Sequence, residues 1–131
     1  MSATLTETQV EISELIREQL LTQVSEEGQV IVHCKIVSGA SDTVARIWRT
    51  TFLLDKHSSH KCRLLHADGV STYPEWTHVP AGTTLHFTLV FSPLPKSCTS
   101  FDFYEQIPEP GGFYVESIAR NKTDVYNIEL S

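Results

Sequence analysis

From residue 28 onward, apolar and polar residues alternate, which is the pattern of β-strands that bury one face. Residues 84–91 show it most clearly, because four apolar side chains fall on one face: Leu85, Phe87, Leu89 and Phe91. Similar stretches occur at residues 30–36, 46–54, 62–66, 70–73, 101–105, 113–118 and 124–130. Turn-forming residues separate them at intervals of about 8–12 residues. The pattern predicts an all-β domain, an antiparallel β-sandwich of about seven to eight strands.

Residues 10–24 follow a different period. Apolar side chains recur at the spacing of one helical face, and they are Ile12, Leu15, Ile16 and Leu20. A strand pair is the alternative, because Val10, Ile12 and Glu14 also alternate. We favour a single domain over residues 1–131, in which a sandwich over residues 28–131 is preceded by an N-terminal amphipathic helix within residues 1–27. Its apolar face needs a partner, either the sheet of its own chain or a second copy, so these residues predict a homo-oligomer interface.

Residues 87–105 contain three short motifs: FTLVF at 87–91, PLPK at 93–96 and SFDF at 100–103, followed by Glu105. This series resembles a pattern found in uncharacterised bacterial immunoglobulin-like β-sandwich domains. The resemblance covers roughly residues 28–118. It implies an immunoglobulin-like fold and no activity, because that group has no catalytic motif that could be transferred. The N-terminal segment departs from the pattern.

Charge and cysteine content limit the partners and the compartment. The formal net charge is -6, whereas phosphate binding requires clustered Lys and Arg, so nucleic acid and anionic membrane surfaces are not expected partners. Residues 1–7 contain no basic region or apolar stretch of a signal peptide, which favours the cytoplasm. Cys34, Cys62 and Cys98 show no CxxC spacing and are interpreted as reduced thiols. No cofactor is indicated.

Three histidines and a cysteine gather in one segment: His57, His60, Cys62 and His66. Nitrogen and sulfur ligands of this kind bind zinc when four of them converge. Cys62 and His66, however, would lie about 13 Å apart along a straight strand. Metal binding therefore remains an alternative to a polar hairpin with solvated histidines and a buried Cys62.

The segment Tyr73-Pro74-Glu75-Trp76-Thr77 predicts an aromatic loop. Tyr73 and Trp76 could stack on a sugar or anchor a protein partner. The alternative, which we favour, is that Trp76 covers the open end of the core. Asp102 and Glu105 are three positions apart and face opposite sides of a strand, so they do not form an acid–base pair, and Glu105 is expected at an edge or turn.

The sequence contains no G-x-S-x-G, H-E-x-x-H, Walker or G-x-G-x-x-G motif. A non-enzymatic protein-interaction or structural module is therefore our first hypothesis. The second is a small-molecule or carbohydrate-binding module that uses the sandwich interior or the Trp76 loop. The third is a metal-binding protein built on the histidine segment.

Overall fold

The computed structural model describes residues 28–131, and the predicted helix with Ile12, Leu15, Ile16 and Leu20 lies outside the described residues. Strands account for the regular structure of this part of the chain. They are β1 (Val30–Val37), β2 (Thr43–Ala45), β3 (Thr51–Asp55), β4 (Lys61–Asp68), β5 (Thr77–Val79), β6 (Thr84–Phe91), β7 (Ser100–Glu105), β8 (Tyr114–Ala119) and β9 (Val125–Leu130). Residues 28–131 include no helix of the length and apolarity needed to cross a membrane. The prediction of an all-β domain is confirmed.

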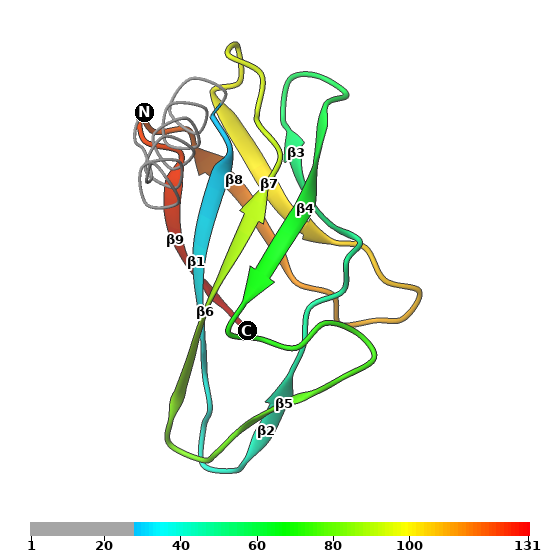
Figure 1. The fold of residues 1–131 in the computed structure, drawn as a ribbon, viewed down its shortest axis with the longest axis vertical. Helices are drawn as coiled ribbons and strands as arrows, with labels where there is room; N and C mark the ends of the chain where they lie inside the picture. The colour runs from blue at the N-terminus through cyan, green and yellow to red at the C-terminus, as the bar shows by residue number, and fades with distance from the viewer. Residues whose placement is uncertain (1–27) are drawn as a thin grey trace, which may run out of the picture.

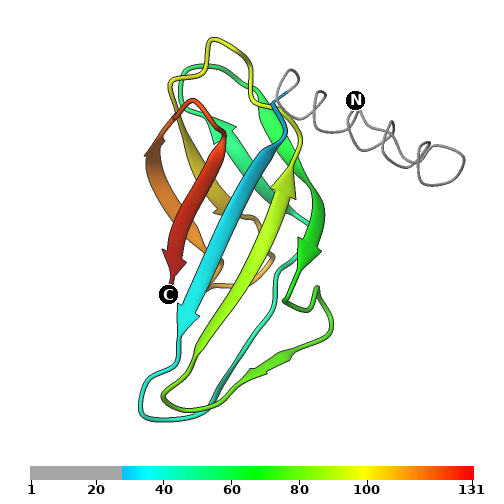
Figure 2. The same cartoon turned by 60° about the vertical axis from the view of Figure 1, so that its left-hand side comes forward.

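Seven strands form one sheet in the order β8-β7-β3-β4-β6-β1-β9. This sheet curls until it nearly closes into a barrel, as Figures 1 and 2 show. Strands β2 and β5 form a separate two-stranded sheet below it in Figure 1. The immunoglobulin-like division into two facing sheets stays a prediction.

The sheet is mixed, which corrects the prediction of a purely antiparallel one. β1 pairs antiparallel with β6 but parallel with β9, where Ile31 lies opposite Val125. The parallel pairing is possible because the chain passes from β8 to β9, the two strands at opposite ends of the strand order, so no hairpin joins β9 to β1. A tight hairpin forces antiparallel neighbours, whereas a chain that leaves one edge for the other can enter beside β1 in either direction.

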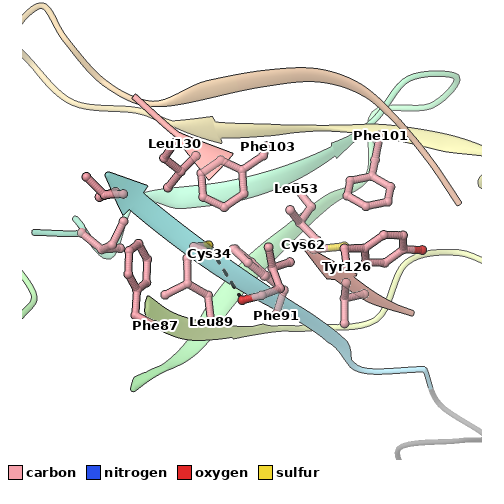
Figure 3. Close-up of a cluster of buried hydrophobic side chains, with 14 of the residues drawn as sticks. Cys34, Leu53, Cys62, Phe87, Leu89, Phe91, Phe101, Phe103, Tyr126 and Leu130 are labelled. Atoms are coloured by element: carbon pink, nitrogen blue, oxygen red, sulfur yellow. Dashed lines mark hydrogen bonds between the residues drawn. The ribbon is translucent and has the colours of Figure 1, made fainter. Parts of the chain in front are cut away.

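The apolar side chains of the alternating strands point into the curled sheet and fill its interior. Side chains from β3 and β7 face those from β6 across it, as Figure 3 shows for Leu53, Phe101 and Phe103 on one side. Phe91 and Phe103 meet edge to face with ring centroids 6.0 Å apart. Each fully buried aromatic or aliphatic side chain contributes about 1.5–3 kcal/mol to stability. The core therefore comes from the period-two pattern that the sequence displays.

Two predicted strands differ from the observed ones. The stretch 46–54 is a strand only from Thr51, and residues 70–73 do not form one. Instead, the two segments bind each other outside the sheets: the Ile47 N–H donates to the Ser71 carbonyl, and the Tyr73 N–H donates to the Ile47 carbonyl, both at 2.9 Å. The short strands β2 and β5 were not anticipated, because three residues carry almost no periodic signal.

A partly buried ionic network joins the loops at the end of the sheet where β8 passes to β9. The Arg120 guanidinium binds both Asp124 carboxylate oxygens at 2.7 and 2.9 Å. It also donates to the carbonyls of Pro95 and Cys98, at 2.6 and 3.2 Å. The Tyr126 hydroxyl donates to Asp124 at 2.8 Å, and Asp124 itself has a φ of 55°. We call these residues the closing network, because they tie the β6–β7 connection to the β8–β9 turn.

Candidate functional site

Four side chains from two separate segments stack on one another at the surface. The rings of Trp48 and Tyr73 are stacked with centroids 3.8 Å apart. The Arg46 guanidinium lies 3.7 Å from the Trp76 ring centroid and 4.7 Å from that of Tyr73. Cation–π contacts form at separations below about 6 Å, so the arginine binds the rings into one unit. We call it the aromatic–arginine cluster.

The small sheet positions this cluster. Strands β2 and β5 pair so that Ala45 lies opposite Thr77, which places the next residue, Arg46, beside the preceding one, Trp76. Arg46 then donates to the Pro74 carbonyl at 3.1 Å, which fixes the guanidinium against the loop. The backbone bonds between Ile47 and the segment 71–73 hold Trp48 against Tyr73. Two short pairings thus determine where all four side chains lie.

A buried carboxylate supports the cluster from beneath. Glu105 is 4% exposed and accepts the Trp48 N–H at 2.9 Å and the Phe113 N–H at 3.1 Å. Burial raises the pKa of Glu105, while these two hydrogen bonds and the charge of Arg46 act to lower it. Glu105 is the last residue of β7, where the β7–β8 turn begins, but its carboxylate is buried and anchors two loops. It is a positioning residue for Trp48.

A hollow of about 270 Å³ lies between the aromatic–arginine cluster and the β7–β8 loop. Apolar surface from Trp48, Trp76 and Phe113 lines it together with the carboxyl groups of Glu105 and Glu109. Ring faces and hydrogen-bonding groups on one wall are the features that a concave binding site combines. The hollow is therefore suited to a small polar ligand or to one side chain of a protein partner.

The interpretation of Trp76 as a cover for the core is wrong. Its side chain is 55% exposed, and Tyr73 is 48% exposed. The Trp76 ring lies at the surface, where one of its faces is covered by the Arg46 guanidinium and not by the core. Sequence reasoning identified Tyr73 and Trp76 but missed Arg46 and Trp48. Their Arg-x-Trp spacing was the available signal, since it places both side chains on one face of an extended segment.

The histidine segment is spread over different environments. His57 lies in the β3–β4 turn and His66 in β4, and both are exposed. His60 and the buried Cys62 come together on one atom, the Pro93 carbonyl oxygen, which lies 3.1 Å from the His60 ring nitrogen and 3.3 Å from the Cys62 sulfur. Among residues 28–131, no group of three or more His, Cys, Asp or Glu side chains is arranged to hold a metal ion. The structure brings two of the four predicted ligands together and leaves the other two apart.

The cysteine thiols are buried and unreactive by their environment. Cys34, Cys62 and Cys98 are free. Burial raises the pKa of Cys34 and of Cys62 to about 12, so both are protonated at neutral pH. A nucleophilic or metal-binding thiolate would need the opposite shift.

Two other hollows, of about 340 and 310 Å³, lie on the face of the sheet formed by β1 and its neighbours. Both contain His33 and His86, and the His33 ring nitrogen lies 2.8 Å from the Thr88 hydroxyl. Figure 2 shows β1 between β6 and β9 on this side of the molecule. These hollows lack the exposed aromatic rings of the aromatic–arginine cluster, which makes the cluster the stronger candidate site.

Searches of the whole chain against protein-family models, curated proteins and solved structures found no significant match, so the site is interpreted from its own geometry.

Proposed function

We propose that this protein is a non-enzymatic protein-interaction module that contacts its partner through the aromatic–arginine cluster. The observation that carries the proposal is the exposure of Trp76 and Tyr73, whose rings both lie against the Arg46 guanidinium. Tryptophan, tyrosine and arginine are the residues most enriched where protein interfaces gain their binding energy.

Preorganisation supports this role. Ordering a flexible side chain on binding costs about 0.5–1.5 kcal/mol, and rings that are already stacked avoid much of that cost. Here the Trp48 backbone is bound by Glu105, and Arg46 is held by Pro74. The cluster therefore offers a large aromatic surface with few rotamers left to restrict.

Site-specific crosslinking tests the proposal. A photoreactive amino acid placed at position 76 of the full chain, in the cells that make it, should crosslink one discrete protein. The same residue at Val37, an apolar position 53% exposed at the end of β1, provides the matched control. Arg46→Ala should weaken crosslinking from position 76, because the stack would lose its central cation. Identical products from positions 76 and 37 would contradict the proposal.

A second function, carbohydrate or small-molecule binding, is favoured by the hollow beside Trp76. Its volume of about 270 Å³ is close to the lower end of the range for ligand sites. Titration of neutral oligosaccharides, followed by tryptophan fluorescence, tests it. Saturable quenching that Glu109→Gln weakens would support a sugar site, and an unchanged spectrum across the panel would remove it.

We also infer an immunoglobulin-like kinship and a cytoplasmic location. The first is supported by the FTLVF…PLPK…SFDF pattern on β6 and β7, and the second by three free cysteines, which persist in reducing compartments. Fractionation of the producing cells tests the location, and recovery with the secreted or envelope fraction would contradict it.

A further inference from the structure

The outer face of β4, β3, β7 and β8 carries an ordered set of side chains. These four strands are neighbours in the sheet, as Figure 1 shows. The register places Phe52 opposite both Arg63 and Tyr104, and Tyr104 opposite Tyr114. This row crosses the face from β4 to β8 over three strand spacings, about 14 Å.

A second row runs parallel to the first. The register places Leu54 opposite Lys61 and Asp102. Glu116 on β8 completes this row, because the Lys56 ammonium binds Asp102 at 3.5 Å and Glu116 at 3.4 Å. We call the two rows together the β4–β8 face.

The middle of the β4–β8 face is apolar except for Asp102 on β7, which the Lys56 ammonium binds. Phe52, Leu54 and Tyr104 are each partly exposed, although they sit at the centre of a sheet face, and Tyr114 is 54% exposed. The Lys61 ammonium covers the Phe52 ring at 4.4 Å. Aromatic side chains exposed side by side on a sheet are typical of surfaces that become buried in an interface.

The two ends of the β4–β8 face carry opposite charge. Lys61 and Arg63 make the β4 end basic. At the β8 end stands Glu116, which shares a single cation, Lys56, with Asp102 on the neighbouring strand β7, so this side of the face is net acidic. Glu116 is the accessible carboxylate, with a side chain 62% exposed, whereas Asp102 is buried. A surface that changes sign from one end to the other complements itself when a second copy is turned end for end.

We propose that the β4–β8 face binds a second copy of this chain, about a two-fold axis that runs parallel to the strands between β3 and β7. Rotation about that axis places Lys61 of one copy against Glu116 of the other. It also places Arg63 against Tyr114, a cation–π pair, and Phe52 against Tyr104, an aromatic pair. Each contact occurs twice, as an isologous interface requires. This surface is separate from the aromatic–arginine cluster, so the proposal does not depend on the proposed partner binding.

Sedimentation velocity of the full chain with two charge reversals tests the interface. Lys61→Glu and Glu116→Lys each create two like-charge contacts across the axis, so each should raise the dimer dissociation constant roughly 100-fold. An equimolar mixture of the two variants should recover the dimer. In that heterodimer, the two substituted side chains pair with reversed polarity on one side of the axis, and the unchanged Lys61 and Glu116 pair on the other.

The controls come from another exposed ion pair on the same sheet. Lys35 and Glu129 lie 4.0 Å apart with side chains about half exposed, outside the β4–β8 face. Lys35→Glu and Glu129→Lys make the same changes of charge and should leave the dissociation constant within twofold of the wild-type value. Circular dichroism should show that all four variants keep the β-sheet spectrum.

Three results would overturn the proposal. The first is a wild-type chain that stays monomeric at a concentration of about 100 μM, well above the dissociation constants of ordinary specific dimers. The second is a dimer that neither Lys61→Glu nor Glu116→Lys weakens, together with dissociation by Leu15→Glu and Leu20→Glu, which would assign the interface to the N-terminal segment. The third is a mixture of the two variants that does not reassociate.

Discussion

Two arginines have opposite roles in this molecule. Arg120 is enclosed in the closing network, where its guanidinium donates to a carboxylate and two carbonyls. Arg46 lies at the surface, and it is held by ring faces and a single carbonyl. The first arrangement uses nearly all the donors of the side chain, whereas the second uses one donor and relies on contacts with ring faces.

This difference separates a structural from a binding role. A buried guanidinium that loses its partners leaves an uncompensated charge in the interior, so it is coupled to the stability of the fold. A guanidinium stacked on exposed rings can exchange water for a ligand at little cost to the fold. The comparison therefore predicts large stability effects at Arg120 and small ones at Arg46.

The largest effect is expected from Arg120→Ala. The substitution leaves the Asp124 carboxylate buried without its counter-charge, which should lower the free energy of unfolding by about 3–5 kcal/mol. Urea denaturation followed by circular dichroism measures it. A loss below about 1 kcal/mol would show that water enters the closing network and that the contrast with Arg46 is absent.

An intermediate effect is expected from Glu105→Ala, which removes the acceptor of two buried backbone N–H groups. We expect the free energy of unfolding to fall by about 2–4 kcal/mol, as measured by urea denaturation.

The variant Glu105→Gln tests how the stability depends on pH. Burial raises the folded-state pKa of Glu105, so the folded protein holds its proton more tightly than the unfolded chain does.

Because the pKa of Glu105 is higher in the folded state, the free energy of unfolding decreases as the pH rises. Below the ordinary pKa of 4.5 both states are protonated, and stability falls as the pH rises from there through the raised folded-state value. The wild-type protein should therefore lose stability relative to Glu105→Gln as the pH rises above the ordinary pKa of 4.5. Denaturation of both proteins at several pH values measures the difference between their unfolding free energies. A wild-type protein that gains stability relative to Glu105→Gln as the pH rises would contradict the raised pKa of Glu105.

The smallest effect is expected from Arg46→Ala. The cation–π contacts of Arg46 with Trp76 and Tyr73 contribute about 0.5–1 kcal/mol each, so the unfolding free energy should fall by no more than about 2 kcal/mol. The same denaturation assay provides the value, and Arg120→Ala is its matched partner. A loss as large as that of Arg120→Ala would make the aromatic–arginine cluster a structural element and remove the main support for its role in binding.

The strands that bury one face could be predicted from the sequence, whereas most of the segments that connect them could not. β6 appears at the predicted bounds, because its four apolar side chains alternate without interruption. Residues 46–50 carry the same rhythm, yet they bind a neighbouring loop instead of a sheet. The alternation shows which side chains are apolar, but it does not show which other segment will form backbone hydrogen bonds with the strand.

The candidate site could be predicted only in part for a related reason. Tyr73 and Trp76 lie in one loop that is evident from composition. Arg46 and Trp48 join them through the pairing of β2 with β5, a ladder of three residue pairs that no local pattern indicates. Contacts between distant segments depend on the whole topology, which is also why the parallel partner of β1 was missed.

The parallel pairing of β1 with β9 also has a mechanical consequence. Tension applied between the start of β1 and the end of β9 would act along both strands in opposite directions. Their backbone hydrogen bonds run across that direction, so the bonds of the whole ladder from Ile31 to Ile36 would be loaded together in shear. An antiparallel terminal pair would instead open one bond at a time. The β1–β9 ladder should consequently resist stretching between these two points more strongly than an antiparallel pair of the same length would.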